Sequence, residues 1–137
     1  MAIVSTKGEY GLTAVLILAR QKDKELLQTK EIAKAGDIPQ NYLEQILVVL
    51  KKSGLVMSIR GASGGYKLAK DPNNITVFDV LQSLECCFAQ TDSSTDKNIL
   101  QPFWEDTQKK VEKIFQITIS ELEEFLEKDS SNLVYYI

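Results

Sequence analysis

The clearest hydrophobic pattern in the chain lies between residues 38 and 52, where apolar side chains recur every three or four positions. These apolar positions are Leu43, Ile46, Leu47 and Leu50. The spacing predicts an amphipathic helix that buries this face. The opposite face is mostly polar and carries Asn41, Glu44, Gln45, Val48 and Lys52. We therefore expect a helix whose outer face meets a polar surface.

A glycine-rich hairpin is predicted directly after this helix. Gly54 ends the helix, and short β-prone runs at Leu55–Ile59 and Tyr66–Leu68 flank the loop RGASGG. A helix followed by a hairpin with an arginine at its tip has the outline of a winged helix. We interpret this stretch as a DNA-reading unit.

Two further helices are predicted upstream. Ser5 or Thr6 caps a first helix that ends near residue 21, and Thr29 caps a short second helix, Lys30–Ala35. A tight glycine-containing turn then leads into the helix described above. Two helices joined in this way form a helix-turn-helix, whose second helix enters the major groove of DNA.

The second half of the chain predicts three more helices. Thr76 and Asp79 form a capping box at the start of one with an apolar stripe. After a polar stretch, a long helix begins near Asn98 and breaks near Ile117. Thr118 then offers a cap to a short final helix.

Large apolar residues follow helical spacing along the long helix. They are Leu100, Phe103, Trp104, Val111, Ile114 and Phe115. They could cover the back of their own domain, but a two-fold partner would bury them and set two reading helices side by side. We predict a mainly α fold with a small β-hairpin wing. A winged helix-turn-helix domain (residues 1–87) is joined by a polar loop (88–97) to a helical dimerisation region and tail (98–137).

Charge divides the chain into two unlike halves. Residues 1–70 hold eleven Lys or Arg against six Asp or Glu, whereas residues 71–137 hold five against thirteen. The halves therefore carry +5 and −8, within a net charge of −3. Chance division is one explanation. The sharper one is a basic module that faces a polyanion and an acidic module that faces away.

Composition narrows the classes of function. The chain has no histidine, which removes the commonest general base and a common zinc ligand. It has no phosphate-binding glycine motif before a helix and no paired carboxylates in an apolar setting. No apolar run approaches the ~18 residues of a membrane span, and the N-terminus lacks the pattern of a secretion signal. We expect a cytoplasmic protein without membrane contact or a metal site, and not an enzyme.

Three segments together resemble the Rrf-type family of bacterial winged-helix transcription regulators. They read STKGEYGLTAVLILA from Ser5, NYLEQILVVLKKSGLVMSIRGASGGYKLA from Asn41, and ITVFDVLQSLE from Ile75. The pairing of YLEQ with RGxxGGY at this spacing is specific, and the resemblance runs over nearly the whole chain. It implies a homodimer that binds double-stranded DNA and regulates transcription, as a repressor in the simplest case.

The resemblance also implies which residues contact DNA. They are Lys7, Thr29, Asn41, Tyr42, Glu44, Gln45, Arg60, Gly61 and Gly64. Glu44 would accept a hydrogen bond from a cytosine amino group, and Arg60 would enter a narrow minor groove. Lys7, at a helix N-terminus, would hold a phosphate. Read without the surrounding motif, Glu44 and Arg60 also fit ordinary solvated surface residues.

The chain departs from the cluster-bearing members of this family at its cysteines. Those members carry three cysteines in the loop after the fourth helix, whereas residues 88–97 contain none. Cys86 and Cys87 come earlier, and Glu9 matches an acidic ligand position of some relatives. Two thiolates and one carboxylate leave a four-ligand set incomplete. We expect no cofactor, as in the family's cysteine-metabolism type, and an iron–sulfur-sensing regulator is the alternative.

The signal is open to more than one hypothesis. Cys86 and Cys87 are candidate redox residues if a thiolate is exposed, or small helix-end hydrophobic residues if it is not. A metabolic enzyme could also dock on the acidic half as a co-repressor, either beside DNA binding or as the main function of an interaction module. Salt dependence separates these readings, because counterion release makes DNA affinity fall steeply with added salt.

Overall fold

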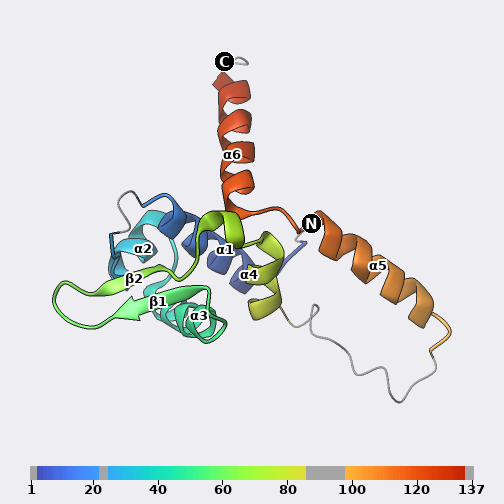
Figure 1. Cartoon of the computed structure of the whole chain (residues 1–137), viewed down its shortest axis with the longest axis horizontal. Coiled ribbons are helices and arrows are strands. Elements are labelled where there is room, and N and C mark those ends of the chain that lie inside the picture. Colours follow the sequence, from blue (N-terminus) through green and yellow to red (C-terminus); the bar gives the residue numbers. More distant parts are fainter. Residues whose placement is uncertain (1–2, 22–24, 86–97, 135–137) are drawn as a thin grey trace.

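The computed structural model describes residues 3–21, 25–85 and 98–134. In chain order the elements are α1 (Thr6–Ala19), α2 (Thr29–Gly36), α3 (Gln40–Lys52), β1 (Val56–Ile59), β2 (Gly65–Leu68), the 3-10 turn η2 (Pro72–Asn74), α4 (Val77–Leu84), α5 (Gln101–Ile114) and α6 (Ile119–Val134). Helices α1 to α4 and the hairpin form a body, from which α6 rises while α5 extends to one side (Figure 1). The predicted mainly α fold with a small β-hairpin is confirmed.

The apolar face of α3 lies at the centre of this body. Leu43, Ile46, Leu47 and Leu50 have no exposed surface, as their spacing predicts. The helix packs against α1, α2, α4 and β1. Burial of each such side chain contributes roughly 1.5–3 kcal/mol. The rotation of α3 about its axis is therefore fixed, and its polar face is held outward.

The hairpin is antiparallel and is also tied to the chain before α2. Val56 of β1 pairs with Leu68 of β2, and Ile59 pairs with Gly65. On the outer side of β2, Leu27 and Tyr66 exchange two backbone hydrogen bonds of 3.0 and 2.7 Å. A two-stranded hairpin alone is marginally stable, so this extra bridge and the packing on α3 hold the wing in place.

Side-chain caps begin α1, α4 and α6 where the sequence predicts them. Ser5 caps α1 by accepting a hydrogen bond from the Gly8 N–H, and Thr76 caps α4 in a capping box with Asp79. The prediction that Thr29 caps α2 is wrong. Thr29 is the first residue inside α2, and the N-cap is Gln28, whose N–H donates to the Glu31 carboxylate at 3.4 Å. Threonine is the better capping residue type, but the helix starts one position earlier than predicted, so Gln28 holds the N-cap position instead of Thr29.

The second half of the chain breaks as predicted but is longer at its end. Helix α5 stops at Ile114, and Thr118 caps α6 by accepting a hydrogen bond from the Glu121 N–H at 3.1 Å. The final helix was predicted to be short, yet α6 has 16 residues against 14 in α5. The polar run after Leu126 contains no glycine or proline, so nothing in it stops the helix.

The first residue of α6, Ile119, belongs to the core of the body. Ile119 is fully buried, and its N–H donates to the Ile75 carbonyl at 2.8 Å. The Val77 N–H donates to the Ile117 carbonyl, so the segment before α6 pairs with the segment before α4. The division into residues 1–87 and 98–137 stays a prediction, but the second region adds a side chain to the core of the first.

Substitution of Ile119 by alanine tests this packing. Removal of a fully buried isoleucine leaves a cavity, so the variant should lose about 2–5 kcal/mol of unfolding free energy in urea titration. Phe125→Ala on the same helix is the control, because that ring is 65% exposed and its loss should change stability by less than about 0.5 kcal/mol. Equal effects of the two substitutions would contradict a core role for the first residue of α6.

Candidate nucleic-acid interface

The outer face of α3 brings together three of the residues predicted to contact DNA, namely Asn41, Glu44 and Gln45. Its exposed side chains are those of Gln40, Asn41, Glu44, Gln45, Val48, Lys51 and Lys52. Within the described residues, the side chains of Asn41, Glu44 and Gln45 form no hydrogen bond with the protein. Their donors and acceptors are therefore free for an external partner. Gln40, at the first position of the helix, was missed because the apolar periodicity starts only at Leu43.

Tyr42 holds a different position from its neighbours. It is half-buried, and its ring meets the Tyr10 ring of α1 edge to face, with centroids 5.6 Å apart and an interplanar angle of 79°. Such a pair contributes about 0.5–1.5 kcal/mol beyond burial. Tyr42 therefore joins the first half of α3 to α1. Lys7 lies one turn before Tyr10 on α1 and is also half-buried.

The wing loop presents Arg60 at the end of β1. Arg60 is exposed, and the next residue, Gly61, has a φ of 121°, which side chains other than glycine rarely adopt. The Gly64 N–H donates to the Gly61 carbonyl at 3.0 Å and closes the turn. A Cβ at Gly64 would overlap the Ile59 carbonyl oxygen. Both glycines thus shape the loop that carries Arg60.

A lysine connects the helix to the wing. The Lys51 Nζ donates to the Ser58 Oγ of β1 at 2.7 Å. The sequence gives no signal for this contact, because the two residues lie on different elements and meet only when the hairpin folds back. It adds to the packing of α3 on β1, which gives the helix face and the Arg60 loop a defined relation.

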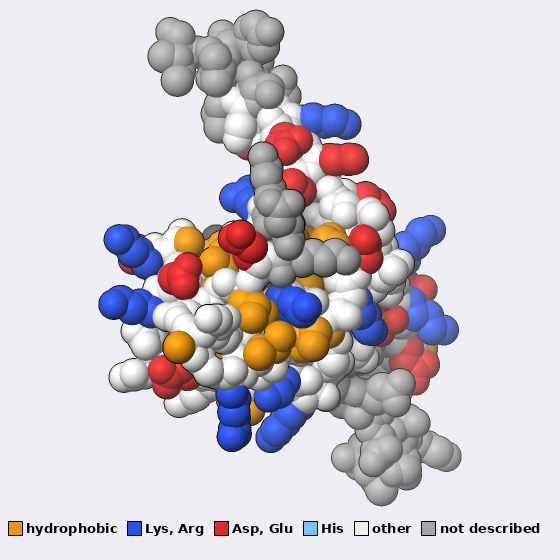
Figure 2. Space-filling view, turned by 60° about the vertical axis from the view of Figure 1, so that its left-hand side comes forward, with side chains coloured by type: hydrophobic (Ala, Val, Ile, Leu, Met, Phe, Trp, Pro, Cys, Tyr) orange, Lys and Arg blue, Asp and Glu red, His pale blue; other side chains and the backbone are white. Residues whose placement is uncertain are grey.

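Most of the described Lys and Arg side chains of the basic lobe (residues 1–70) form no ion pair with the protein. Within residues 3–21, 25–85 and 98–134, the ion pairs are Arg20 with Glu123 and Lys110 with Asp106. The exposed cations of the lobe without such a pair are Lys30, Lys34, Lys51, Lys52, Arg60 and Lys70. Figure 2 shows one face of the molecule, with Lys and Arg side chains projecting from several of its edges. The positive half of the chain is therefore available to a polyanion.

The apolar stripe of α5 is mostly uncovered. Leu100, Phe103, Trp104 and Ile114 are exposed, whereas Val111 and Phe115 are partly buried against the body. Phe103 is 58% and Trp104 52% exposed, and their rings touch at a centroid distance of 5.2 Å. The alternative in which these two rings cover their own domain is therefore not what the structure shows.

Comparison with known proteins places the chain in a family. Residues 4–128 match the family model named Rrf2 and described as an iron-dependent transcriptional regulator. The chain belongs to the Rrf2 family. The HTH-type transcriptional regulator CymR of Bacillus subtilis (strain 168) is 44% identical over 82 residues, which span 60% of this chain and 59% of that protein. The resemblance expected from the motifs is confirmed.

Solved structures of the family agree with the fold. T. potens IscR aligns with a TM-score of 0.76 and 34% identity, covering 93% of this chain and 90% of that one. CymR (YrzC), the global cysteine regulator of B. subtilis, aligns with a TM-score of 0.75 and 33% identity, covering 91% and 98%. The winged-helix interpretation is confirmed, and the Rrf2 family consists of transcriptional regulators rather than enzymes, as expected for this chain.

The family description raises the question of iron. Cys86, Cys87 and the loop 88–97 lie outside the described residues. Inside them, no group of three or more His, Cys, Asp or Glu side chains could hold a metal ion. Glu9 is exposed beside an apolar hollow of about 390 Å³. With two cysteines and no histidine, the chain offers fewer than the four thiolate or imidazole ligands that usually hold an iron–sulfur cluster. The absence of a cofactor stays a prediction.

The helices of the described ranges include none with the length and apolar character of a membrane span.

Gly64→Ala tests the geometry of the wing loop. The new methyl group would overlap the Ile59 carbonyl, so the loop must shift at a loss of about 1–3 kcal/mol of unfolding free energy, measured by urea denaturation. Ser63→Ala is the matched control because its side chain is exposed in the same loop. A Gly64→Ala variant as stable as the control would show that the loop does not need the close approach.

Proposed function

We propose that the chain is a dimeric, sequence-specific DNA-binding regulator, acting as a repressor in the cytoplasm. The observation that carries the proposal is the free polar face of α3, held beside the Arg60 loop by the Lys51–Ser58 hydrogen bond. Family membership supports it, as does the basic balance of residues 1–70. A protein seated on an operator would exclude polymerase, which is the simplest route to repression.

Reading of the operator would combine two grooves. With α3 in the major groove, Glu44 would accept from a cytosine amino group, and Asn41 or Gln45 would pair with adenine or a phosphate. Arg60 would enter the adjacent minor groove, where A·T-rich sequence narrows the groove and attracts arginine. Lys7 and Thr29, each in the first turn of a helix, would hold phosphates.

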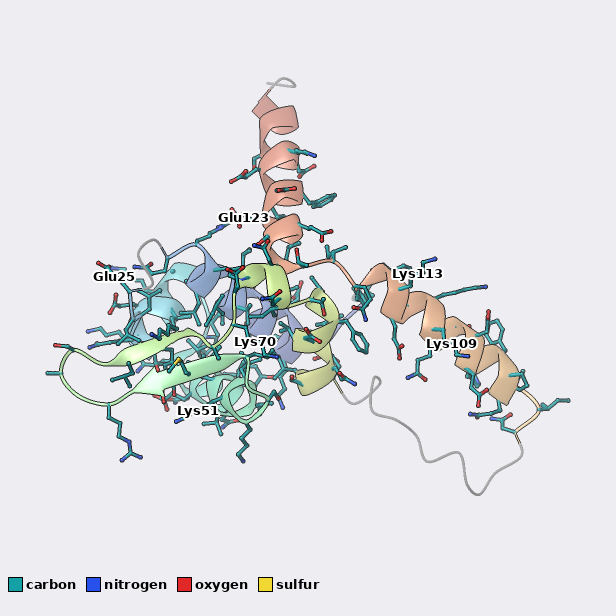
Figure 3. The ribbon with its side chains drawn as sticks, viewed as in Figure 1. Glu25, Lys51, Lys70, Lys109, Lys113 and Glu123 are labelled. Carbon is teal, nitrogen blue, oxygen red and sulfur yellow. The ribbon has the colours of Figure 1, made fainter. Side chains whose placement is uncertain are left out.

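A second copy of the chain is the proposed occupant of the α5 stripe. Four large apolar side chains lie uncovered along one side of this helix, and such a patch marks an interaction site. Lys109 and Lys113, both labelled on α5 in Figure 3, occupy helical positions opposite the stripe. Pairing through the stripe would place two reading helices on half-sites roughly 34 Å apart.

For the signal that controls DNA binding we propose two alternatives. A thiol switch at Cys86 or Cys87 would act through the stretch that separates α4 from α5. A metabolic enzyme as co-repressor would instead need a docking surface, for which α6 offers the exposed acidic side chains of Glu121, Glu124 and Asp129. Neither alternative alters the DNA-reading proposal.

Two substitutions separate base reading from general attraction. Glu44→Ala should remove one base contact and so weaken binding to the specific operator by about 1–3 kcal/mol. Its affinity for random duplex should stay nearly unchanged. Arg60→Ala should weaken binding to both the specific and the random duplex, and it should relax the base preference in the minor-groove segment. Gel-shift titrations on specific and random duplexes measure these effects, with Glu105→Ala on α5 as control. Equal losses on both duplexes for Glu44→Ala would reject its role as a base reader.

Wild-type binding should also depend steeply on salt. The logarithm of affinity should fall linearly with the logarithm of salt concentration, since each neutralised phosphate releases counterions. Affinity that ignores both ionic strength and base order would reject the DNA-binding proposal and leave the interaction module in its place.

Trp104→Ala tests the dimer. The indole is 52% exposed in a single chain, so its removal should leave the fold intact while weakening self-association by about 2 kcal/mol or more, roughly thirtyfold. Sedimentation over a range of concentrations measures this shift. Lys109→Ala, on the opposite side of α5, should sediment like the wild type. A monomeric wild type at every concentration would remove the dimer from the proposal.

A further inference from the structure

A carboxylate from the end of α4 lies on the first turn of α1. The Glu85 Oε1 accepts a hydrogen bond from the Ser5 N–H at 2.9 Å and another from the Ser5 Oγ at 2.6 Å. Ser5 is the N-cap of α1, and its Oγ in turn accepts from the Gly8 N–H at 3.2 Å. Two elements that are 80 residues apart in sequence thus meet through one negatively charged group.

The packing around this carboxylate is close. A Cβ at Gly8 would overlap the Glu85 Oε1 and lie 3.3 Å from a methyl group of Leu81. Glycine at position 8 therefore allows the carboxylate to settle against the helix. Glu85 is half-buried there, and it has no cation as an ion-pair partner within the described residues.

The same helix turn is the one proposed to hold a DNA phosphate. Glu85 occupies the side of the turn that faces α4, while the N–H groups of Thr6 and Lys7, in the first turn of the helix, are left without a helical acceptor. A phosphate on those groups would lie within about 5–8 Å of the carboxylate, since one turn rises only ~5.4 Å. Two negative groups at that separation repel across less than a Debye length at low salt.

We propose that Glu85 weakens DNA binding electrostatically, by placing a fixed negative charge beside the phosphate contact of α1. This inference rests on the proposed DNA-binding function. The carboxylate stabilises the folded chain because an anion is favoured at a helix N-terminus. It opposes the bound complex because the phosphate is an anion as well. The effect is independent of base sequence, since only the phosphate is involved.

Glu85→Gln isolates the charge, because glutamine retains an acceptor oxygen for Ser5. At about 50 mM salt the variant should bind both specific and random duplex about three times more tightly per subunit, or roughly ninefold per dimer, from repulsion across water. The ratio of the variant's affinity to the wild-type affinity should approach one as salt rises to about 0.5 M, because the repulsion is screened. Its melting temperature should fall, since a charge-assisted hydrogen bond becomes a neutral one.

Glu85→Asp is the matched variant. It keeps the charge but shortens the reach to Ser5, so it should lose thermal stability while its DNA affinity stays at the wild-type value. A merely structural role would lower stability and affinity together in both variants. Fluorescence anisotropy titrations at several salt concentrations, with thermal melts, give both quantities.

The results that would overturn the inference are specific. Glu85→Gln binding no tighter than wild type at low salt would overturn it, as would Glu85→Asp tightening as much as Glu85→Gln. In both cases wild-type binding to duplex would still stand, and with it the proposed function. Failure of the wild type to bind any duplex would instead reject the proposed function.

Discussion

The buried side of α3 is the constraint on which the rest of the structure depends. Four apolar side chains on that side have no exposed surface, and α1, α2 and α4 exist in this arrangement because they cover it. A helix with one face so firmly buried cannot rotate, and so its polar residues must face outward. The hairpin then packs on the same helix, and the Arg60 loop takes its direction from that contact. The outward polar face of α3 is thus a consequence of core packing.

The elements that local sequence determines were predicted well. Periodicity gave α3, the caps at Ser5 and Thr76 gave the starts of α1 and α4, and the glycine loop gave the hairpin. These signals act within a few residues. The errors lie where two local signals compete, as at Gln28 and Thr29, or where nothing stops a helix, as at the end of α6.

The candidate site was predictable only in part, for a related reason. Exposure of Asn41, Glu44 and Gln45 follows from the helix period, and their likeness to a family motif supplied the roles. The contacts that hold the site together join distant elements: Lys51 to Ser58, and Glu85 to Ser5. Each is a pairing of common polar residues with no pattern of its own. Only the fold determines which of many such residues meet.

Helix α3, the proposed reading helix, is held near both of its ends by contacts within the chain. Near its start the Tyr42 ring rests on Tyr10 of α1, and in its last turn Lys51 holds β1. A preorganised surface loses little conformational freedom on binding, so more of its contact energy is available for affinity. The same rigidity limits how a signal can act. If two copies pair through the uncovered stripe of α5 as proposed, a signal would act most directly on the spacing between the two copies.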